Sequence, residues 1–147
     1  MSEKITVLLI DDHELIRNGL GAVLDLEDDL DVVATAGSVS EGIERWRQYQ
    51  PDVVITDLQM QDGTGLDVVR TIRKESDKVG LIVLTMHSGD EQIFAAMQAG
   101  ASGFVGKDAP STEVIKTARH AAVSPKAFVC AGLVGAMMRR SRLNRPL

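Results

Sequence analysis

The sequence lacks the features of a membrane-spanning or disulfide-stabilised protein. It holds one cysteine among 147 residues, Cys130, which has no internal disulfide partner and no surrounding cluster of metal ligands. No uncharged apolar run approaches the roughly 18 residues that argue for a membrane span, and no cationic start precedes an apolar run as in a secretion signal. We therefore expect a soluble cytoplasmic protein without a membrane partner, in which Cys130 is a small core or interface residue.

Acidic residues are missing from the C-terminal part of the chain. All 21 lie at or before Glu113, whereas residues 123–147 hold five of the 16 lysines and arginines. Residues 1–122 hold the other 11 against all 21 acidic residues, a net charge of −10, and residues 123–147 carry +5. This asymmetry predicts two regions with different roles. The acidic region is not expected to bind nucleic acid by itself, since phosphate contacts need clustered lysine and arginine.

Short apolar, β-branched runs alternate with segments of helical periodicity. Four apolar residues between positions 16 and 24 have the i, i+4, i+7, i+8 spacing of one helix face. Capping boxes, in which a serine caps a helix and a glutamate three residues later reaches back, mark two further helix starts at Ser38 and Ser88. The last helix has apolar residues at 114, 115, 118 and 122. The expected strands are residues 5–10, 32–36, 53–56, 81–85 and 103–105.

This alternation of five strands with helices indicates an α/β fold. Parallel neighbouring strands need crossover connections, so the helices should cover both faces of a parallel sheet. The runs VVI at 53–55 and LIVL at 81–84 are entirely apolar, which is typical of central strands buried on both sides. Neither a Pro-rich nor a Ser-rich linker interrupts this part of the chain, so we expect one domain.

The pattern changes at Ser124 and Pro125, which break the chain. Residues 127–138 then follow without a charge, before the basic end RRSRLNRPL. This stretch is too short to cross a bilayer. We interpret it as a linker helix whose apolar face runs from Val129 through Leu133 to Met137, although its other side is scarcely more polar. The alternative is a frayed chain end.

Reactive side chains stand at the expected carboxyl ends of four strands. They are Asp11, Asp12, Asp57, Thr85 and Lys107. Ligands of open parallel sheets bind at this edge. Clustered carboxylates need a cation, and Mg²⁺ binds one or two carboxylates together with water and phosphate oxygens, while Lys107 and Thr85 suit the anion. Acidic residues at strand ends also cap helices, a role that we favour for Asp11 alone but not for all five residues together.

Three stretches, IDDHELIR, VVITDLQMQDGTGLDVVR and LTMHSGDEQIFAAMQAGASGFVGKD, resemble the receiver domain of two-component response regulators, over about residues 4–122. DDHELIR and AGASGFVGKD look most like the NarL/FixJ subfamily, whose members usually carry a LuxR-type helix-turn-helix after the receiver. The resemblance implies a flavodoxin-like, doubly wound sheet of five parallel strands in the order 2-1-3-4-5, with a C-terminal linker helix. The receiver would span residues 1–122, and the linker helix and basic tail residues 123–147.

The resemblance also implies roles for the acidic residues. Asp57 would accept a phosphoryl group from a sensor histidine kinase, as an aspartyl phosphate. Asp12 and Asp57 would ligate Mg²⁺ directly, with the main-chain carbonyl of Gln59 as a third protein ligand. Asp11 would act largely through water. His13 would be a surface residue or a residue that supports the ligands.

Three further residues would respond to the phosphoryl group. Lys107 would bind it, Thr85 would move to hydrogen-bond it, and Phe104 would rotate inward behind Thr85. The result would be a change in dimerisation through the face formed by the fourth and fifth helices, or through the tail. Two positions depart from the usual pattern, since Gln61 and Asp108 stand where many receivers have proline.

Two other motifs have an alternative interpretation. Gly63 and Gly65, in DGTGLD, are interpreted as turn residues before a helix, rather than as a flexible loop that lets the backbone approach the phosphorylation site. His87 is expected either to tune the lifetime of the acyl phosphate or to be a solvated loop residue.

The expected protein is a phosphorylation-controlled switch rather than an enzyme. We favour a transcription regulator truncated before its DNA-binding helix-turn-helix, and the alternative is a stand-alone, single-domain regulator. A Mg²⁺-dependent phosphohydrolase with an aspartate nucleophile is disfavoured, because Gln59 stands two residues after Asp57, where such enzymes need an acid or base. The interpretation as a nucleotide-binding protein is less favoured still, since neither GxGxxG nor a P-loop follows the first strand.

Overall fold

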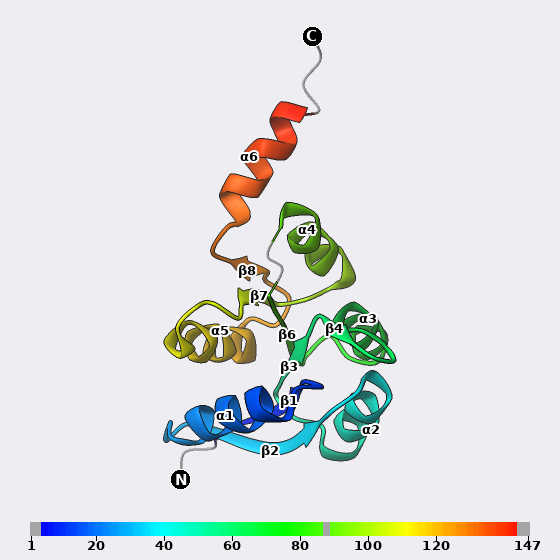
Figure 1. Cartoon of the computed structure of the whole chain (residues 1–147), viewed down its shortest axis with the longest axis vertical. Coiled ribbons are helices and arrows are strands. Elements are labelled where there is room, and N and C mark those ends of the chain that lie inside the picture. Colours follow the sequence, from blue (N-terminus) through cyan, green and yellow to red (C-terminus); the bar gives the residue numbers. More distant parts are fainter. Residues whose placement is uncertain (1–3, 87–88, 144–147) are drawn as a thin grey trace.

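In a computed structural model of the chain, which describes residues 4–86 and 89–143, a parallel sheet of six strands runs through the centre of the described part (Figure 1). Its order is β2-β1-β3-β6-β7-β8. The chain therefore adds β2 on one side of β1 and all later strands of this sheet on the other side. The strands are β1 (Ile5–Ile10), β2 (Leu30–Ala36), β3 (Val53–Asp57), β6 (Gly80–Thr85), β7 (Gly103–Gly106) and β8 (Val129–Cys130). The α/β, flavodoxin-like arrangement expected from the sequence is confirmed.

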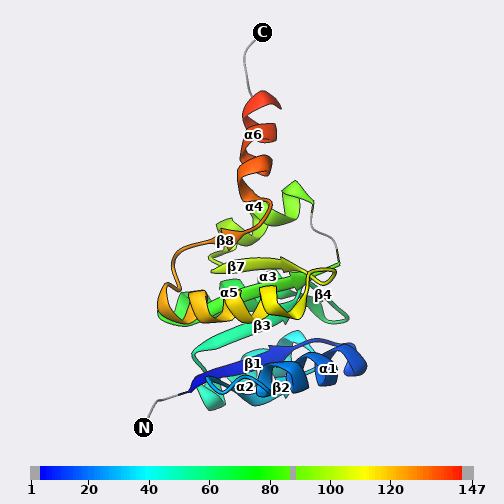
Figure 2. The same ribbon diagram turned by 90° about the vertical axis from the view of Figure 1, so that its left-hand side faces the viewer.

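Helices cover both faces of the sheet because alternate residues of each strand point to opposite sides. Leu8 and Ile10 of β1 belong to the core under α2, α3 and α4, whereas Val7 and Leu9 belong to the core under α1 and α5. Figure 2 shows α1 and α5 together on the face turned toward the viewer. The helices are α1 (Glu14–Asp25), α2 (Val39–Tyr49), α3 (Gly65–Glu75), α4 (Asp90–Ala99), α5 (Ser111–Val123) and α6 (Leu133–Leu143).

The helix starts follow the capping chemistry only in part. Ser38 caps α2 by accepting from the main-chain N–H of Glu41 at 3.1 Å, as expected. The predicted cap Ser88 lies outside the described residues. An unpredicted capping box starts α3, where Thr64 and Asp67 satisfy each other's main-chain N–H groups.

The sixth strand corrects the expectation of five strands and of a helix from residue 127. Val129 and Cys130 form β8 and pair in parallel with β7, and α6 begins only at Leu133. The physical reason is the open edge of β7, since the N–H of Val129 donates to the carbonyl of Ser102 at 2.9 Å. Cys130 is half-buried on β8, in line with the core or interface role expected for it, and burial raises the pKa of its thiol.

The segment after α5, residues 124–143, is called the C-terminal segment below. Its helix α6 projects beyond the sheet beside α4 (Figure 1). Ala136 is fully buried, Arg139 forms a bidentate pair with Asp90 at 2.6 and 2.8 Å, and the guanidinium of Arg140 lies 4.6 Å from the centre of the Phe94 ring. A helix is therefore present over part of the range in which the linker helix was expected, and one side of it packs on α4.

No helix in residues 4–86 or 89–143 combines the length and the apolar character that crossing a membrane requires.

Candidate functional site

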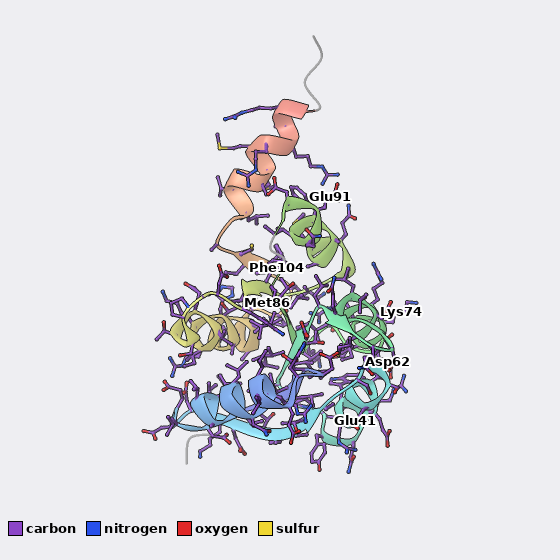
Figure 3. The ribbon with its side chains drawn as sticks, viewed as in Figure 1. Glu41, Asp62, Lys74, Met86, Glu91 and Phe104 are labelled. Atoms are coloured by element: carbon purple, nitrogen blue, oxygen red, sulfur yellow. The ribbon has the colours of Figure 1, made fainter. Side chains whose placement is uncertain are left out.

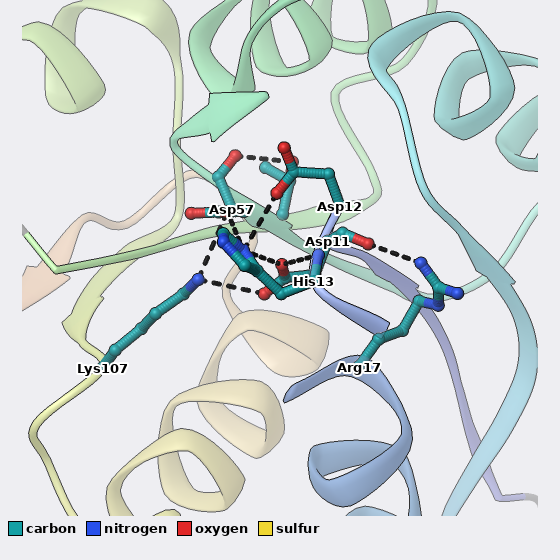
Figure 4. Close-up of polar contacts among 7 residues, drawn as sticks. Asp11, Asp12, His13, Arg17, Asp57 and Lys107 are labelled. Carbon is teal, nitrogen blue, oxygen red and sulfur yellow. Dashed lines mark hydrogen bonds and ion pairs between the residues drawn. The ribbon is translucent and has the colours of Figure 1, made fainter. Parts of the chain in front are cut away.

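The carboxyl ends of β1, β3 and β7 bring together the acidic residues and the lysine that the sequence singles out. Asp11 and Asp12 follow β1, Asp57 is the last residue of β3, and Lys107 follows β7. These strands all run in one direction, so their ends meet at one edge of the sheet. Figure 4 shows Lys107 and the acidic residues converging there from different strands. We call Asp11, Asp12 and Asp57 the acidic cluster.

One buried lysine is shared by two carboxylates of the acidic cluster. The Nζ of Lys107 lies 3.1 Å from Oδ2 of Asp11 and 3.2 Å from Oδ2 of Asp57. The lysine side chain is 6 % exposed, and its main-chain N–H donates to the carbonyl of Thr85 at 2.7 Å. One positive charge thus faces three aspartates, which leaves the cluster short of positive charge.

The surroundings of Asp57 disfavour the charged form of its carboxyl group. Burial raises its pKa above the usual range, and the charge of Asp11 raises it further, while Lys107 opposes both effects. The backbone of Asp57 is fixed, because the hydroxyl of Thr56 donates to its main-chain carbonyl at 3.0 Å. A cation that offsets its charge would therefore be bound favourably at this position.

Asp12 supplies a carboxylate oxygen with no hydrogen bond. Its Oδ1 is buried and has no such partner among the described residues. Nδ1 of His13 is 3.0 Å away, but the contact does not have hydrogen-bond geometry. One ligand atom from each of Asp11, Asp12, His13 and Asp57 lies within 4.8 Å of the others. An orphaned buried oxygen in a set of three carboxylates fits a divalent cation with oxygen preference, such as Mg²⁺.

The loop after Asp57 folds into a short hairpin of β4 (Gln59–Met60) and β5 (Gly63–Thr64), which the sequence did not predict. The side chain of Gln59 is exposed, and the expected ligand from this residue is its main-chain carbonyl. The carboxylate of Asp62 accepts from the N–H groups of Val39 and Ser40 at 2.8 and 3.1 Å, which ties the hairpin to the start of α2 (Figure 3). An isolated aspartate in a turn gave no sequence signal for this contact.

Gly65 does more than begin a helix. A Cβ at this position would lie 2.2 Å from the main-chain oxygen of Asp57, a distance that no packed atoms tolerate. The interpretation of Gly65 as an ordinary turn residue is therefore insufficient, because it permits a close approach to the backbone of Asp57. Gly63 has a positive φ of 151°, which explains a glycine there in terms of turn geometry.

Thr85 and Phe104 lie on one face of the sheet. Thr85 ends β6 and is 2 % exposed, and Phe104 on β7 is 3 % exposed. Phe104 pairs with Val83, two residues before Thr85, so the two side chains point to the same side. The expected inward rotation of Phe104 is not needed to bury its ring, which already packs in the core under α4. His87 lies outside the described residues.

Comparisons with known proteins agree with this geometry. The family described as the response regulator receiver domain matches residues 7–119. The DNA-binding transcriptional activator DevR/DosR of Mycobacterium tuberculosis is 36 % identical over 115 residues, which are 78 % of this chain and 53 % of that protein. The nitrate/nitrite response regulator protein homolog of Haemophilus influenzae is 32 % identical over 147 residues, all of this chain and 70 % of that protein.

A solved structure extends the likeness to the whole fold. The LuxR-family two-component response regulator from Aurantimonas sp. SI85-9A1 has a TM-score of 0.87 at 25 % identity, covering 97 % of this chain and 100 % of that one. By contrast, this chain spans only about half the length of several curated relatives, 53 % for DevR/DosR. The likeness therefore concerns their receiver portion.

Proposed function

The chain belongs to the response regulator receiver domain family, and we propose that it is a phosphorylation-controlled switch in which Asp57 receives a phosphoryl group from the phosphohistidine of a sensor histidine kinase. One observation carries the proposal: Asp57 is buried at the carboxyl edge of the sheet, 3.2 Å from Lys107, and burial and the charge of Asp11 raise its pKa. A carboxylate in this position is a nucleophile whose charge needs a partner.

The transfer step places few demands on acid or base groups. An oxygen of the Asp57 carboxylate forms the bond to phosphorus while the phosphorus–nitrogen bond of the phosphohistidine breaks, and the imidazole nitrogen keeps the electron pair. Such a reaction depends on positioning and charge neutralisation. Lys107 would hold a phosphoryl oxygen in place of its contact with Asp57, and the hydroxyl of Thr85 would donate a hydrogen bond to another.

We propose that Mg²⁺ is the cofactor. Asp12 and Asp57 would hold it directly with the main-chain carbonyl of Gln59, and Asp11 would contribute through water. When bound, the ion supplies positive charge for the carboxylates and for the incoming phosphoryl group. The support from the structure is the unpartnered Oδ1 of Asp12 and the excess of carboxylates over lysine.

The proposed output is a surface change rather than a released product. Phosphorylation would shift a two-state equilibrium through Thr85 and Phe104 toward the face of α4 and α5, where a second copy of the chain would bind. Residues 1–122 would act as the receiver and residues 123–147 as a linker helix and basic tail. DNA would be bound only by a helix-turn-helix domain outside this chain, and the protein would act in the cytoplasm. The relative DevR/DosR, a DNA-binding transcriptional activator, supports a transcriptional output.

Two alternatives differ in what they predict. A stand-alone regulator would share the phosphorylation chemistry but would act on a protein partner instead of DNA. A phosphohydrolase would turn over an external substrate, and the exposed Gln59, two residues after Asp57, cannot transfer a proton for it. We therefore favour the switch over the enzyme.

The test is incubation of the chain with acetyl phosphate and Mg²⁺, followed by intact mass measurement. We expect the wild type to gain the mass of one phosphoryl group, and Asp57→Asn to gain none. Asp28→Asn removes an exposed carboxylate at a distant turn and serves as the matched control, which should be phosphorylated like the wild type. Equal labelling of Asp57→Asn, or no labelling of the wild type, would contradict the assignment of Asp57.

A further inference from the structure

Arg17 holds the main chain of the acidic cluster from α1. It lies in the first turn of this helix, and its main-chain N–H donates to the carbonyl of His13 at 2.9 Å. Helical side chains lean toward the N-terminus of their helix, which here follows the end of β1. The Nη1 of Arg17 donates to the main-chain carbonyl of Asp11 at 2.7 Å, from a different side of Asp11 than Lys107 (Figure 4).

The guanidinium of Arg17 is committed to this main-chain oxygen. In the part of the chain that the structure describes, it forms no ion pair with a carboxylate, although the residue that it contacts belongs to the acidic cluster. Gly37, which follows β2, leaves room for it, because a Cβ there would lie only 3.1 Å from Nη1 of Arg17. The charged end of Arg17 therefore acts on the backbone of Asp11 and not on its carboxylate.

Asp11 and Asp12 differ in how their side chains are held. Asp11 uses all of its polar groups: its N–H donates to the carbonyl of Ala36 at 3.0 Å, its carbonyl accepts from Arg17, its Oδ1 accepts from the N–H of His13 at 2.9 Å, and its Oδ2 lies 3.1 Å from Nζ of Lys107. By contrast, the buried Oδ1 of Asp12 has no hydrogen bond among the described residues. The position of the Asp12 carboxylate therefore depends on the backbone that carries it.

The contact with Arg17 restrains this backbone. The peptide between Asp11 and Asp12 is planar, so the carbonyl oxygen of Asp11 and the Cα of Asp12 lie in one plane. A donor that holds the oxygen limits the rotation of this plane, and with it the direction in which the Asp12 side chain leaves the chain. Binding groups work only when the surrounding residues hold them to within about 0.5 Å, so such a restraint matters for a metal ligand.

We infer that Arg17 is a positioning residue of the candidate site, which directs the carboxylate of Asp12 toward the cation by holding the main-chain carbonyl of Asp11. The inference rests on the proposed function, since Asp12 is there the direct ligand of Mg²⁺. The sign of the effect separates positioning from charge. A positive charge near the site repels Mg²⁺, so its removal alone would strengthen Mg²⁺ binding, whereas the loss of positioning weakens it.

The experiment is a Mg²⁺ titration of the full chain, followed by the amide NMR signals of Asp12 and Asp57. We expect Arg17→Ala to bind Mg²⁺ about 10-fold more weakly than the wild type, as for other residues that orient metal ligands. Arg17→Lys keeps one donor without the planar fork, and should bind Mg²⁺ within about threefold of the wild type. At saturating Mg²⁺, acetyl phosphate should label Arg17→Ala within about twofold of the wild-type rate, because the bound ion restores the position of Asp12.

Arg73→Ala is the matched control. Arg73 also donates to main-chain carbonyls, at 2.9 Å to Gly100 and 2.8 Å to Val79, but these lie before β7 and β6, at the edge of the sheet opposite the acidic cluster. Its loss should lower stability and leave the affinity for Mg²⁺ unchanged. If Arg17→Ala does not fold, Arg17→Met keeps the apolar stem without the donor and should show the same weaker Mg²⁺ binding.

Two results would overturn the inference: unchanged or stronger Mg²⁺ binding when Arg17 is replaced by alanine or methionine, or an equal loss of Mg²⁺ affinity in Arg73→Ala. The second result would mean that lower stability alone weakens the site. Failure here is separable from failure of the proposed function. Phosphorylation of Asp57 together with unchanged Mg²⁺ binding by the variants rejects only the role of Arg17, and the reverse pattern rejects only the phosphoacceptor.

Discussion

The acidic cluster and the C-terminal segment both gather polar groups from distant parts of the chain, but they satisfy them to different degrees. In the cluster, Asp11 and Asp57 share Lys107, and one buried oxygen of Asp12 has no hydrogen bond. At the C-terminal segment, Lys126 pairs with Asp77 and Arg139 pairs with Asp90, so each of these two cations has its own carboxylate. The first region should respond to ligands and to pH, and the second should act as a fixed support.

Arg73 shows most clearly how the polar groups around the C-terminal segment find hydrogen-bond partners. From α3 it donates to the carbonyls of Gly100, Val79 and Pro125 at 2.9, 2.8 and 3.3 Å, and to the hydroxyl of Ser102 at 3.2 Å. Ser102 is fully buried and donates to the same carbonyl of Pro125. This network joins the start of the C-terminal segment to α3 and to the loops before β6 and β7.

The largest expected effect is therefore the loss of Arg73. Arg73→Ala would leave half-buried carbonyls without donors, and we expect the free energy of unfolding to fall by about 3 kcal/mol, because each unmet buried group costs about 1–3 kcal/mol. Urea denaturation measures this change. Arg70→Ala is the control on the same helix, since its side chain is 54 % exposed and its ion pair with Asp67 is long, at 3.6 Å.

That control should change stability by less than about 0.5 kcal/mol. Equal effects of the two substitutions would mean that the Arg73 network does not anchor the C-terminal segment. The C-terminal segment would then not be the well-anchored region that the comparison with the acidic cluster assumes.

The same contrast explains which parts of the fold were predictable. The central strands β3 and β6 are largely apolar runs that are buried along their whole length, so their positions could be predicted from local composition. The two-residue strand β8 has no periodicity of its own and forms because the edge of β7 is open. The hairpin of β4 and β5 is equally short, and it depends on Asp62 binding the start of α2.

The candidate site likewise has a part that the sequence predicts and a part that it does not. Asp11, Asp12, Asp57 and Lys107 come together because parallel strands end at one edge, a rule that needs only the strand positions. The inclusion of His13 depends on a turn fixed by Asp11, which sequence spacing does not reveal. The roles of these residues, and the division at residue 122, remain predictions.

The second expected effect is that removing the charge of Asp57 stabilises the fold at neutral pH. Asp57→Asn would relieve burial and repulsion by Asp11 but would also lose attraction to Lys107, so we expect a net gain on the order of 1 kcal/mol. The pKa of Asp57 is raised in the folded state, so its carboxylate opposes folding at neutral pH, and this cost disappears as the pH falls through the folded pKa.

The gain from Asp57→Asn should therefore shrink as the solution is acidified, which thermal unfolding across a pH series would measure. Asp28→Asn again serves as the control, because it removes an exposed carboxylate. A constant gain at every pH, or a loss of stability at neutral pH, would mean that the cluster is not electrostatically strained without a ligand.

The smallest expected effect comes from the exposed pair between α6 and α4. Arg139→Ala removes the contact with Asp90, whose pKa Arg139 lowers, but the buried Ala136 and the contact of Arg140 with Phe94 remain. We expect the α6 amides to exchange hydrogen about two- to fivefold faster, without loss of the fold, and the difference to fade at high salt. Arg142→Ala, at an exposed position of the same helix, should leave the exchange rates unchanged. A large, salt-independent rise in exchange would instead show that α6 is held mainly by this pair, so that the C-terminal segment has one detachable contact rather than several that support one another.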